Sequence, residues 1–84
     1  MKKRRSDNIL KWCGERIKHY RKENGLSQED ISTLLDVDFS QYGKIERGQT
    51  NITLSTLENI ADKLNVEPME LLNFGTPIKI QLLK

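Results

Sequence analysis

The chain has 84 residues, a formal net charge of +2 and a single cysteine, Cys13. A domain of this length buries only about 60% of its unfolded surface, so we expect no large internal active-site cavity, and one cysteine can form neither an intramolecular disulfide nor a cysteine-based zinc site. Because no apolar run approaches the ~20 residues of a membrane span and no signal-peptide core follows the basic start, we expect a cytoplasmic protein without a membrane partner.

Positive charge gathers at the start of the chain. Residues 1–22 contain nine Lys or Arg and two Asp or Glu, whereas residues 23–84 contain five and ten. Such a basic segment is typical of a polyanion partner, because neutralising phosphates releases condensed counterions. A solvated basic tail explains the same charge without a partner. We expect residues 1–8 to form a basic, flexible arm.

Residues 9–24 are predicted to form the first helix. Its apolar and amphipathic side chains recur at helical spacing on one face, namely Ile9, Cys13, Ile17 and Tyr20. Gly25 closes this helix. We expect Cys13 to be a small buried residue on its inner face.

A second helix is predicted to begin after Ser27. The Ser27 hydroxyl can accept a backbone N–H as N-cap, and Asp30 stands three residues later, where a capping box has its acidic partner. The apolar face that follows consists of Ile31, Leu34 and Leu35.

A tight turn and a third helix follow. Val37 is predicted to plug the core between the two helices, and Asp38 is predicted to cap the third helix, with Gln41 three residues on. In this helix Tyr42 and Ile45 face inward, and Gly48 ends it. The residues expected to look outward are Phe39, Ser40, Gln41 and Lys44.

Two more helices are predicted after residue 52. Thr53 is the expected N-cap of the fourth helix and Asn65 suits its end. The buried face of this helix is predicted to consist of Leu54, Leu57, Ile60, Ala61 and Leu64. Pro68 suits the first position of a fifth helix, and the core is predicted to be closed by Met69, Leu71 and Leu72.

Residues 74–84 form a C-terminal extension with a different pattern. Gly75 and Pro77 mark a break, after which Ile78, Ile80 and Leu82 alternate with polar residues at period two. This alternation predicts a short β-strand, whose unpaired edge needs a partner. A second copy of the same strand would supply one and make a homodimer. A frayed tail that packs loosely on the fifth helix is the alternative.

Several motifs together resemble one family. They are GLSQEDI at residues 25–31, the apolar Leu35 and Val37, and IERG ending at Gly48. The chain resembles, over residues 9–72, the phage repressor and Cro type of helix-turn-helix protein, also called the XRE family. The resemblance implies an all-α, five-helix DNA-binding domain over residues 9–73. It also implies a transcriptional regulator, expected to repress, that binds a palindromic operator in double-stranded DNA as a homodimer.

One departure from this family concerns the turn, and another the third helix. Asp36 stands where the family usually has glycine, so the turn requires Asp36 to adopt a left-handed conformation, which aspartate tolerates better than most residues. Gly43 lies inside the third helix and is expected to cost about 0.5–1 kcal/mol relative to alanine.

The resemblance also implies roles for individual residues. Gln28 would contact the DNA backbone, and base edges would be met by Phe39, Ser40 and Lys44. Phosphates would be held by Gln41, Arg47, Gln49, Thr50 and Asn51. For Gln41 a capping role competes with this one. In this family the positions of Arg21 and Glu46 are commonly joined by a salt bridge that orients the third helix.

An antitoxin whose C-terminal segment engages a toxin and a restriction–modification controller protein both fit the same fold. No P-loop, GxGxxG or HExxH pattern occurs, and the single histidine, His19, lies in a charged stretch. We therefore expect no enzymatic activity, no catalytic or metal-binding residues and no cofactor.

Overall fold

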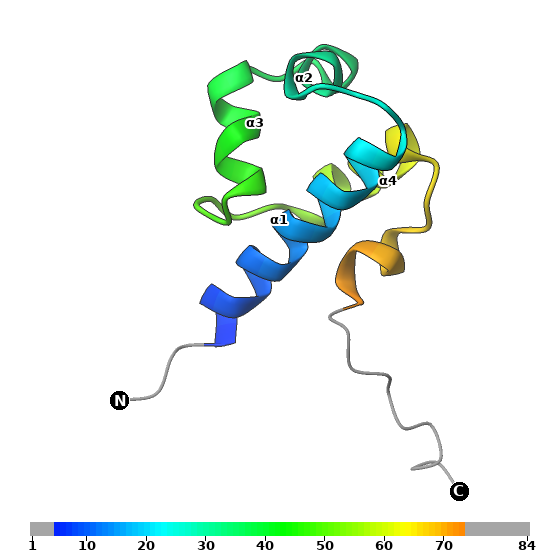
Figure 1. The fold of residues 1–84 in the computed structure, drawn as a ribbon. Coiled ribbons are helices and arrows are strands. Elements are labelled where there is room, and N and C mark those ends of the chain that lie inside the picture. The colour runs from blue at the N-terminus through cyan, green and yellow to red at the C-terminus, as the bar shows by residue number, and fades with distance from the viewer. Residues whose placement is uncertain (1–4, 74–84) are drawn as a thin grey trace, which may run out of the picture.

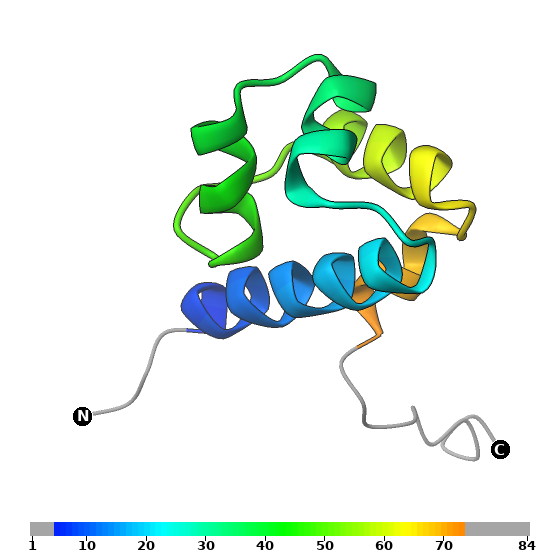
Figure 2. The ribbon, with the colours of Figure 1, turned by 45° about the horizontal axis from the view of Figure 1, so that its top comes forward.

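The computed structural model describes residues 5–73, which form an all-helical domain without a β-strand. The elements within that range are α1 (Arg5–Glu23), α2 (Gln28–Leu35), α3 (Phe39–Glu46), α4 (Leu54–Leu64) and the 3₁₀ helix η1 (Pro68–Leu72). Helix α1 lies along one side of the domain, and α3, α4 and η1 all pack against it (Figure 2). Helix α2 packs against both α3 and α4, and therefore completes a single core.

The core gathers apolar side chains from every element. It consists of Cys13, Ile17, Ile31, Leu35, Tyr42, Ile45, Leu57, Ile60, Ala61, Leu64 and Leu71. Val37, in the turn between α2 and α3, is half-buried and packs against this cluster, as the sequence predicts. Burial raises the pKa of the Cys13 thiol, so this residue stays a neutral, apolar part of the core.

Five residues predicted to be buried are exposed instead: Ile9, Leu34, Leu54, Met69 and Leu72. All except Ile9 lie at or next to a helix end, where the neighbouring helices no longer cover the surface. Ile9 belongs to the part of α1 that precedes its contact with α3 at Gly14. The largest departures are Leu54, 79% exposed, and Met69, 70% exposed.

The predicted fifth helix is a 3₁₀ helix rather than an α-helix. Pro68 does occupy its start, but the backbone of Glu70 donates to Glu67 and that of Asn73 donates to Glu70, both three residues back. A five-residue segment leaves room for at most one or two i to i+4 hydrogen bonds, so the tighter 3₁₀ turn forms.

Helix α1 also begins earlier than predicted, at Arg5 instead of Ile9. No glycine or proline separates these two residues, so nothing in the sequence breaks the helix there. Residues 5–8 of the predicted arm are therefore helical. Residues 1–4 of that arm and the predicted strand over 78–83 lie outside the described residues.

Two glycines bring the end of α3 directly onto α1. A Cβ atom on Gly14 would lie below contact distance from the carbonyl oxygen of Glu46, and one on Gly48 would lie 2.7 Å from the Cα of Lys11. Gly48 also has φ +70°, in the left-handed region that glycine adopts without strain. Backbone therefore rests on backbone, and no room remains for a larger side chain between α1 and the end of α3.

Polar contacts fix η1 to α1. Arg16 donates from Nε to the carbonyl oxygen of Glu70 at 2.6 Å, and the Tyr20 hydroxyl donates to Glu70 Oε1 at 3.0 Å. Asn24 donates from Nδ2 to the carbonyl oxygen of Leu64, at the end of α4, at 3.0 Å. The last element of the described chain is thus anchored to the first.

Candidate nucleic-acid interface

Helix α2 begins and ends as the sequence predicts. Ser27 caps it, with Oγ accepting from the backbone N–H of Asp30 at 2.9 Å, while the Asp30 carboxylate accepts from the Ser27 N–H at 2.9 Å. These hydrogen bonds hold the pKa of Asp30 below its ordinary value. At the other end Asp36 has φ 59° and ψ 44°, the left-handed conformation expected where a glycine is usual. The chain then turns into α3, which packs against α2.

Helix α3 has two distinct faces. Tyr42, Gly43, Ile45 and Glu46 are buried against the rest of the domain. The outward-looking residues predicted from the sequence are all exposed, namely Phe39, Ser40, Gln41 and Lys44. Phe39 leaves 56% of its surface exposed. Helix α3 stands at the edge of the molecule, so this face is open to a partner (Figure 1).

The start of α3 differs from the prediction in one respect. Asp38 occupies the N-cap position, but its side chain makes no capping hydrogen bond. It accepts instead from the Ser40 hydroxyl, at a long 3.4 Å. The predicted capping pair of Asp38 and Gln41 is therefore wrong, and Gln41 remains an exposed side chain.

The chain after α3 carries the remaining predicted residues. Arg47 is exposed and donates from Nε to Gln49 Oε1 at 3.0 Å, across the turn at Gly48. Asn51 is exposed and Thr50 is half-buried. Arg47 and Gln49 are thus brought together, on the same end of α3 as Lys44.

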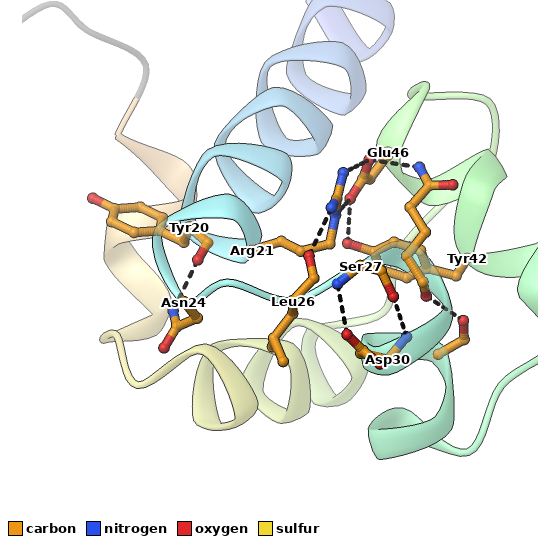
Figure 3. Close-up of polar contacts among 10 residues, drawn as sticks. Tyr20, Arg21, Asn24, Leu26, Ser27, Asp30, Tyr42 and Glu46 are labelled. Atoms are coloured by element: carbon orange, nitrogen blue, oxygen red, sulfur yellow. Dashed lines mark hydrogen bonds and ion pairs between the residues drawn. The ribbon is translucent and has the colours of Figure 1, made fainter.

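A buried hydrogen-bonded network centres on Glu46, and Figure 3 shows it between α1, α2 and α3. The predicted partner Arg21 donates from Nε to Glu46 Oε2 at 2.5 Å and from Nη2 to Oε1 at 3.2 Å. The Tyr42 hydroxyl donates to Oε2 at 2.5 Å, and Gln28 donates from Nε2 to Oε1 at 2.8 Å. Arg21 also donates to the carbonyl oxygen of Leu26 at 2.9 Å. We call Arg21, Gln28, Tyr42 and Glu46 the Glu46 network.

The network keeps its carboxylate charged. Burial alone would raise the pKa of Glu46, but the hydrogen bonds from Arg21, Tyr42 and Gln28 outweigh burial and hold that pKa below its ordinary value. The Glu46 contact likewise raises the pKa of Arg21 against the effect of burial. Burial, and then the neighbouring carboxylate, raise the pKa of Tyr42, which therefore stays a neutral donor.

Sequence reasoning missed two members of this network. The prediction that Tyr42 faces the core is confirmed, but its hydrogen bond to Glu46 was not predicted. The spacing of four residues puts both side chains on one side of α3 and indicates that they can meet. For Gln28 the resemblance implies only a contact with the DNA backbone. Its contact with Glu46 depends on how α2 sits against α3, which no local pattern reveals.

Residues 5–73 contain neither a cluster of metal ligands nor a membrane-spanning helix. No group of three or more His, Cys, Asp or Glu residues there is arranged to hold a metal ion. No helix within residues 5–73 is long and apolar enough to cross a membrane.

The sequence matches a known family and several of its members. Residues 17–71 match the family model described as helix-turn-helix. The control protein C.BamHI of Bacillus amyloliquefaciens is 32% identical over 72 residues, which are 84% of this chain and 89% of that protein.

Solved structures share the fold. The restriction-modification controller protein C.AhdI from Aeromonas hydrophila is 40% identical, with a TM-score of 0.70 over 74% of this chain and 94% of that one. SinR, described as the master regulator for biofilm formation and solved in complex with DNA, is 39% identical, with a TM-score of 0.67 over 73% of this chain and 98% of that one.

Proposed function

Because the chain belongs to the helix-turn-helix family of Cro/C1-type DNA-binding regulators, we propose that it reads a palindromic operator as a homodimer, through the outward face of α3. The major groove of DNA is about 12 Å wide and admits one α-helix. The observation that carries the proposal is the exposed face of α3, which combines one aromatic, two polar and one basic side chain above a fully packed inner face.

Three side chains on this face would meet base edges. Lys44 can donate to guanine O6 or N7, Ser40 can donate or accept, and Phe39 can lie against a thymine methyl group. The exposure of Phe39 supports its role, because a large apolar side chain that is 56% exposed gains from being covered.

Other side chains would hold the DNA backbone and fix the register. For this role we propose Gln41, Arg47, Gln49, Thr50 and Asn51. Gln28 would add a contact at the start of α2 and, through its hydrogen bond to Glu46, would hold α2 and α3 at the angle that the groove requires. Residues 1–4 would contribute positive charge near phosphates or the minor groove.

We further propose that the regulated genes encode a restriction–modification system. The similarity to C.AhdI and to C.BamHI, each over most of both chains, supports this assignment over an antitoxin role. In this proposal the protein binds DNA without catalysing a reaction, and it acts in the cytoplasm.

The test begins with selection of bound DNA from a random pool, where we expect a palindromic consensus with half-sites about one helical turn apart. On that operator, Lys44→Ala should lose base preference at one position in each half-site, at a cost of about 1–3 kcal/mol. Binding to operators with single base changes, measured at several salt concentrations, reads out this loss.

Deletion of residues 2–4 is the matched control, because it also removes positive charge. It should weaken binding to all sequences alike and flatten the salt dependence, since arm residues contact phosphates. Unchanged base preference in Lys44→Ala, or altered preference in the deletion, would contradict the assigned roles.

A further inference from the structure

An apolar groove lies on the surface between α4 and η1. It has a volume of about 400 Å³ and is lined by Leu54, Ser55, Leu57, Glu58, Pro68 and Leu72. Leu54 leaves 79% of its surface exposed and Leu72 43%, and the neighbouring Met69 leaves 70% exposed. Adjacent exposed apolar side chains of this size are typical of a surface that another segment or molecule covers.

The end of the chain begins at this groove. Leu72 forms part of its wall, and Asn73, the next residue, has an extended backbone with φ −88° and ψ 105°. The 11 residues after Asn73 contain three large apolar side chains at period two, Ile78, Ile80 and Leu82. In an extended segment such residues share one face, which would suit an apolar groove.

The charges of the two surfaces are opposite. Lys79 and Lys84 are the charged residues of the C-terminal extension. The groove contributes Glu58, and the exposed Glu67 directly precedes Pro68, which lines the groove. Opposite charges beside an apolar contact favour one partner over others and set its register.

From these observations we infer that residues 78–83 of a second copy occupy the groove between α4 and η1, and that the two copies exchange these segments reciprocally. The inference rests on the proposed function, in which two copies read the two half-sites of an operator. It identifies the surfaces that join them.

Two observations favour exchange between copies over an arrangement in which each chain's C-terminal segment occupies its own groove. Asn73 is already extended, and Thr76 precedes Pro77, which disfavours the helical region for Thr76. Two of the five residues that connect Leu72 to Ile78 therefore favour extended backbone, which directs the chain away from its own groove. Returning to the chain's own groove would require the chain to reverse within the five residues 73–77.

Two substitutions test the inference in the full-length chain. Leu54→Asp places a charge in the groove, and Ile80→Asp places one on the proposed occupant. Leu54 is the first residue of α4 and is exposed, so aspartate there suits the helix start and leaves the core intact. Each substitution should raise the dimer dissociation constant about a hundredfold or more, because a symmetric exchange contains the altered contact twice.

Leu34→Asp is the matched control, because Leu34 is an exposed leucine of α2 that does not line the groove. It should leave the dimer unchanged. Sedimentation without DNA measures all three variants, and circular dichroism verifies that each is folded. A folded Leu54→Asp or Ile80→Asp variant that dimerises like the parent chain would overturn the inference.

Mixing the two variants separates exchange from its alternatives. A mixed dimer pairs the intact C-terminal segment of Leu54→Asp with the intact groove of Ile80→Asp, so one of its two contacts is normal. Dimers should therefore reappear on mixing, at concentrations where either variant alone is monomeric. If each chain covered its own groove, or if two grooves met face to face, mixing would restore nothing, and the inference would be wrong.

The readouts distinguish this inference from the proposed function. Lys44→Ala should dimerise normally while losing base preference, since Lys44 lies on α3 and does not line the groove. Normal exchange in a chain that selects no palindrome would refute the proposed function alone. A selected palindrome together with failed rescue on mixing would refute the exchange alone.

Discussion

At the scale of single residues, the buried ion pair of Glu46 is where a substitution is expected to reduce stability most. Its carboxylate accepts from Arg21, Gln28 and Tyr42, which belong to three different helices. Removing one partner from a buried ion pair costs on the order of 3–5 kcal/mol, because the remaining charge stays buried without compensation. Here two neutral donors remain after the loss of Arg21, which places the expected cost near the lower end.

A double-mutant cycle measures this coupling. We expect Arg21→Met to lower the free energy of unfolding by about 3 kcal/mol, and the pair Arg21→Met with Glu46→Leu to recover part of that loss. Recovery should be incomplete, because Tyr42 and Gln28 then lose their shared acceptor. Urea unfolding of the parent, both single variants and the double variant gives the coupling energy. Additive effects would show that the two side chains do not act together.

Two carboxylates are expected to make the free energy of unfolding depend on pH in the acidic range. The pKa values of Asp30 and Glu46 are both lower in the folded chain than their ordinary values of 3.8 and 4.5. A group with a lowered pKa in the folded state stabilises that state above its ordinary pKa, and this contribution is lost as the pH falls through the folded pKa.

Unfolding measured across pH should therefore show a constant free energy near neutrality and a decline below about pH 4.5. Glu46→Gln and Asp30→Asn should each make the decline less steep, at the expense of stability at neutral pH. An acid decline equally steep in both variants would mean that other groups cause it.

At the scale of elements, the contact of α1 with α3 depends on Gly14. A Cβ atom there would lie below contact distance from the Glu46 carbonyl oxygen, which is backbone and cannot rotate away. We expect Gly14→Ala to destabilise the fold by at least about 1–3 kcal/mol, despite the higher helix propensity of alanine. It should also weaken operator binding, because α3 must move to make room.

Glu15→Ala is the control for this substitution, since Glu15 is the exposed neighbour of Gly14 on the same helix. It should change stability by less than about 0.5 kcal/mol. Urea unfolding and operator binding measure both variants. A Gly14→Ala chain as stable as the parent would show that α1 and α3 separate without cost.

The sequence predicts helix ends well, because each end depends on a few neighbouring residues. Ser27, Thr53 and Asn65 begin or end helices as expected, because a cap requires only a few neighbouring residues. Asp36 adopts the left-handed conformation for the same reason. The position of a helix end along the chain is therefore largely encoded in the residues that form it.

What the sequence could not predict depends on packing between elements. Leu54 and Leu72 follow the apolar period of their segments, yet they are exposed, because no described residue covers the groove that they line. Gln28 looks like a surface residue at the start of α2, and its contact with Glu46 arises only when α3 is in place. The outward residues of α3 could be predicted, because its apolar residues define the inner face and helical periodicity places the others on the opposite side.

At the scale of the whole molecule, one copy offers limited discrimination among DNA sequences. Each good base contact is worth about 1–3 kcal/mol, and a single α3 presents three side chains proposed for this task. Two copies on a palindrome double the number of contacts within one complex. Under the proposed function, the second copy therefore adds selectivity as well as affinity.

The division of α3 into two faces has a consequence for how such a protein can change over evolutionary time. Tyr42, Ile45 and Glu46 hold the fold, whereas Ser40 and Lys44 make no contribution to the core. Exchanging exposed residues usually changes stability by less than about 0.5 kcal/mol. Under the proposed function, new operator preferences can therefore arise by substitution at these exposed positions while the scaffold remains the same. Related chains could then diverge in their target genes without passing through unfolded intermediates.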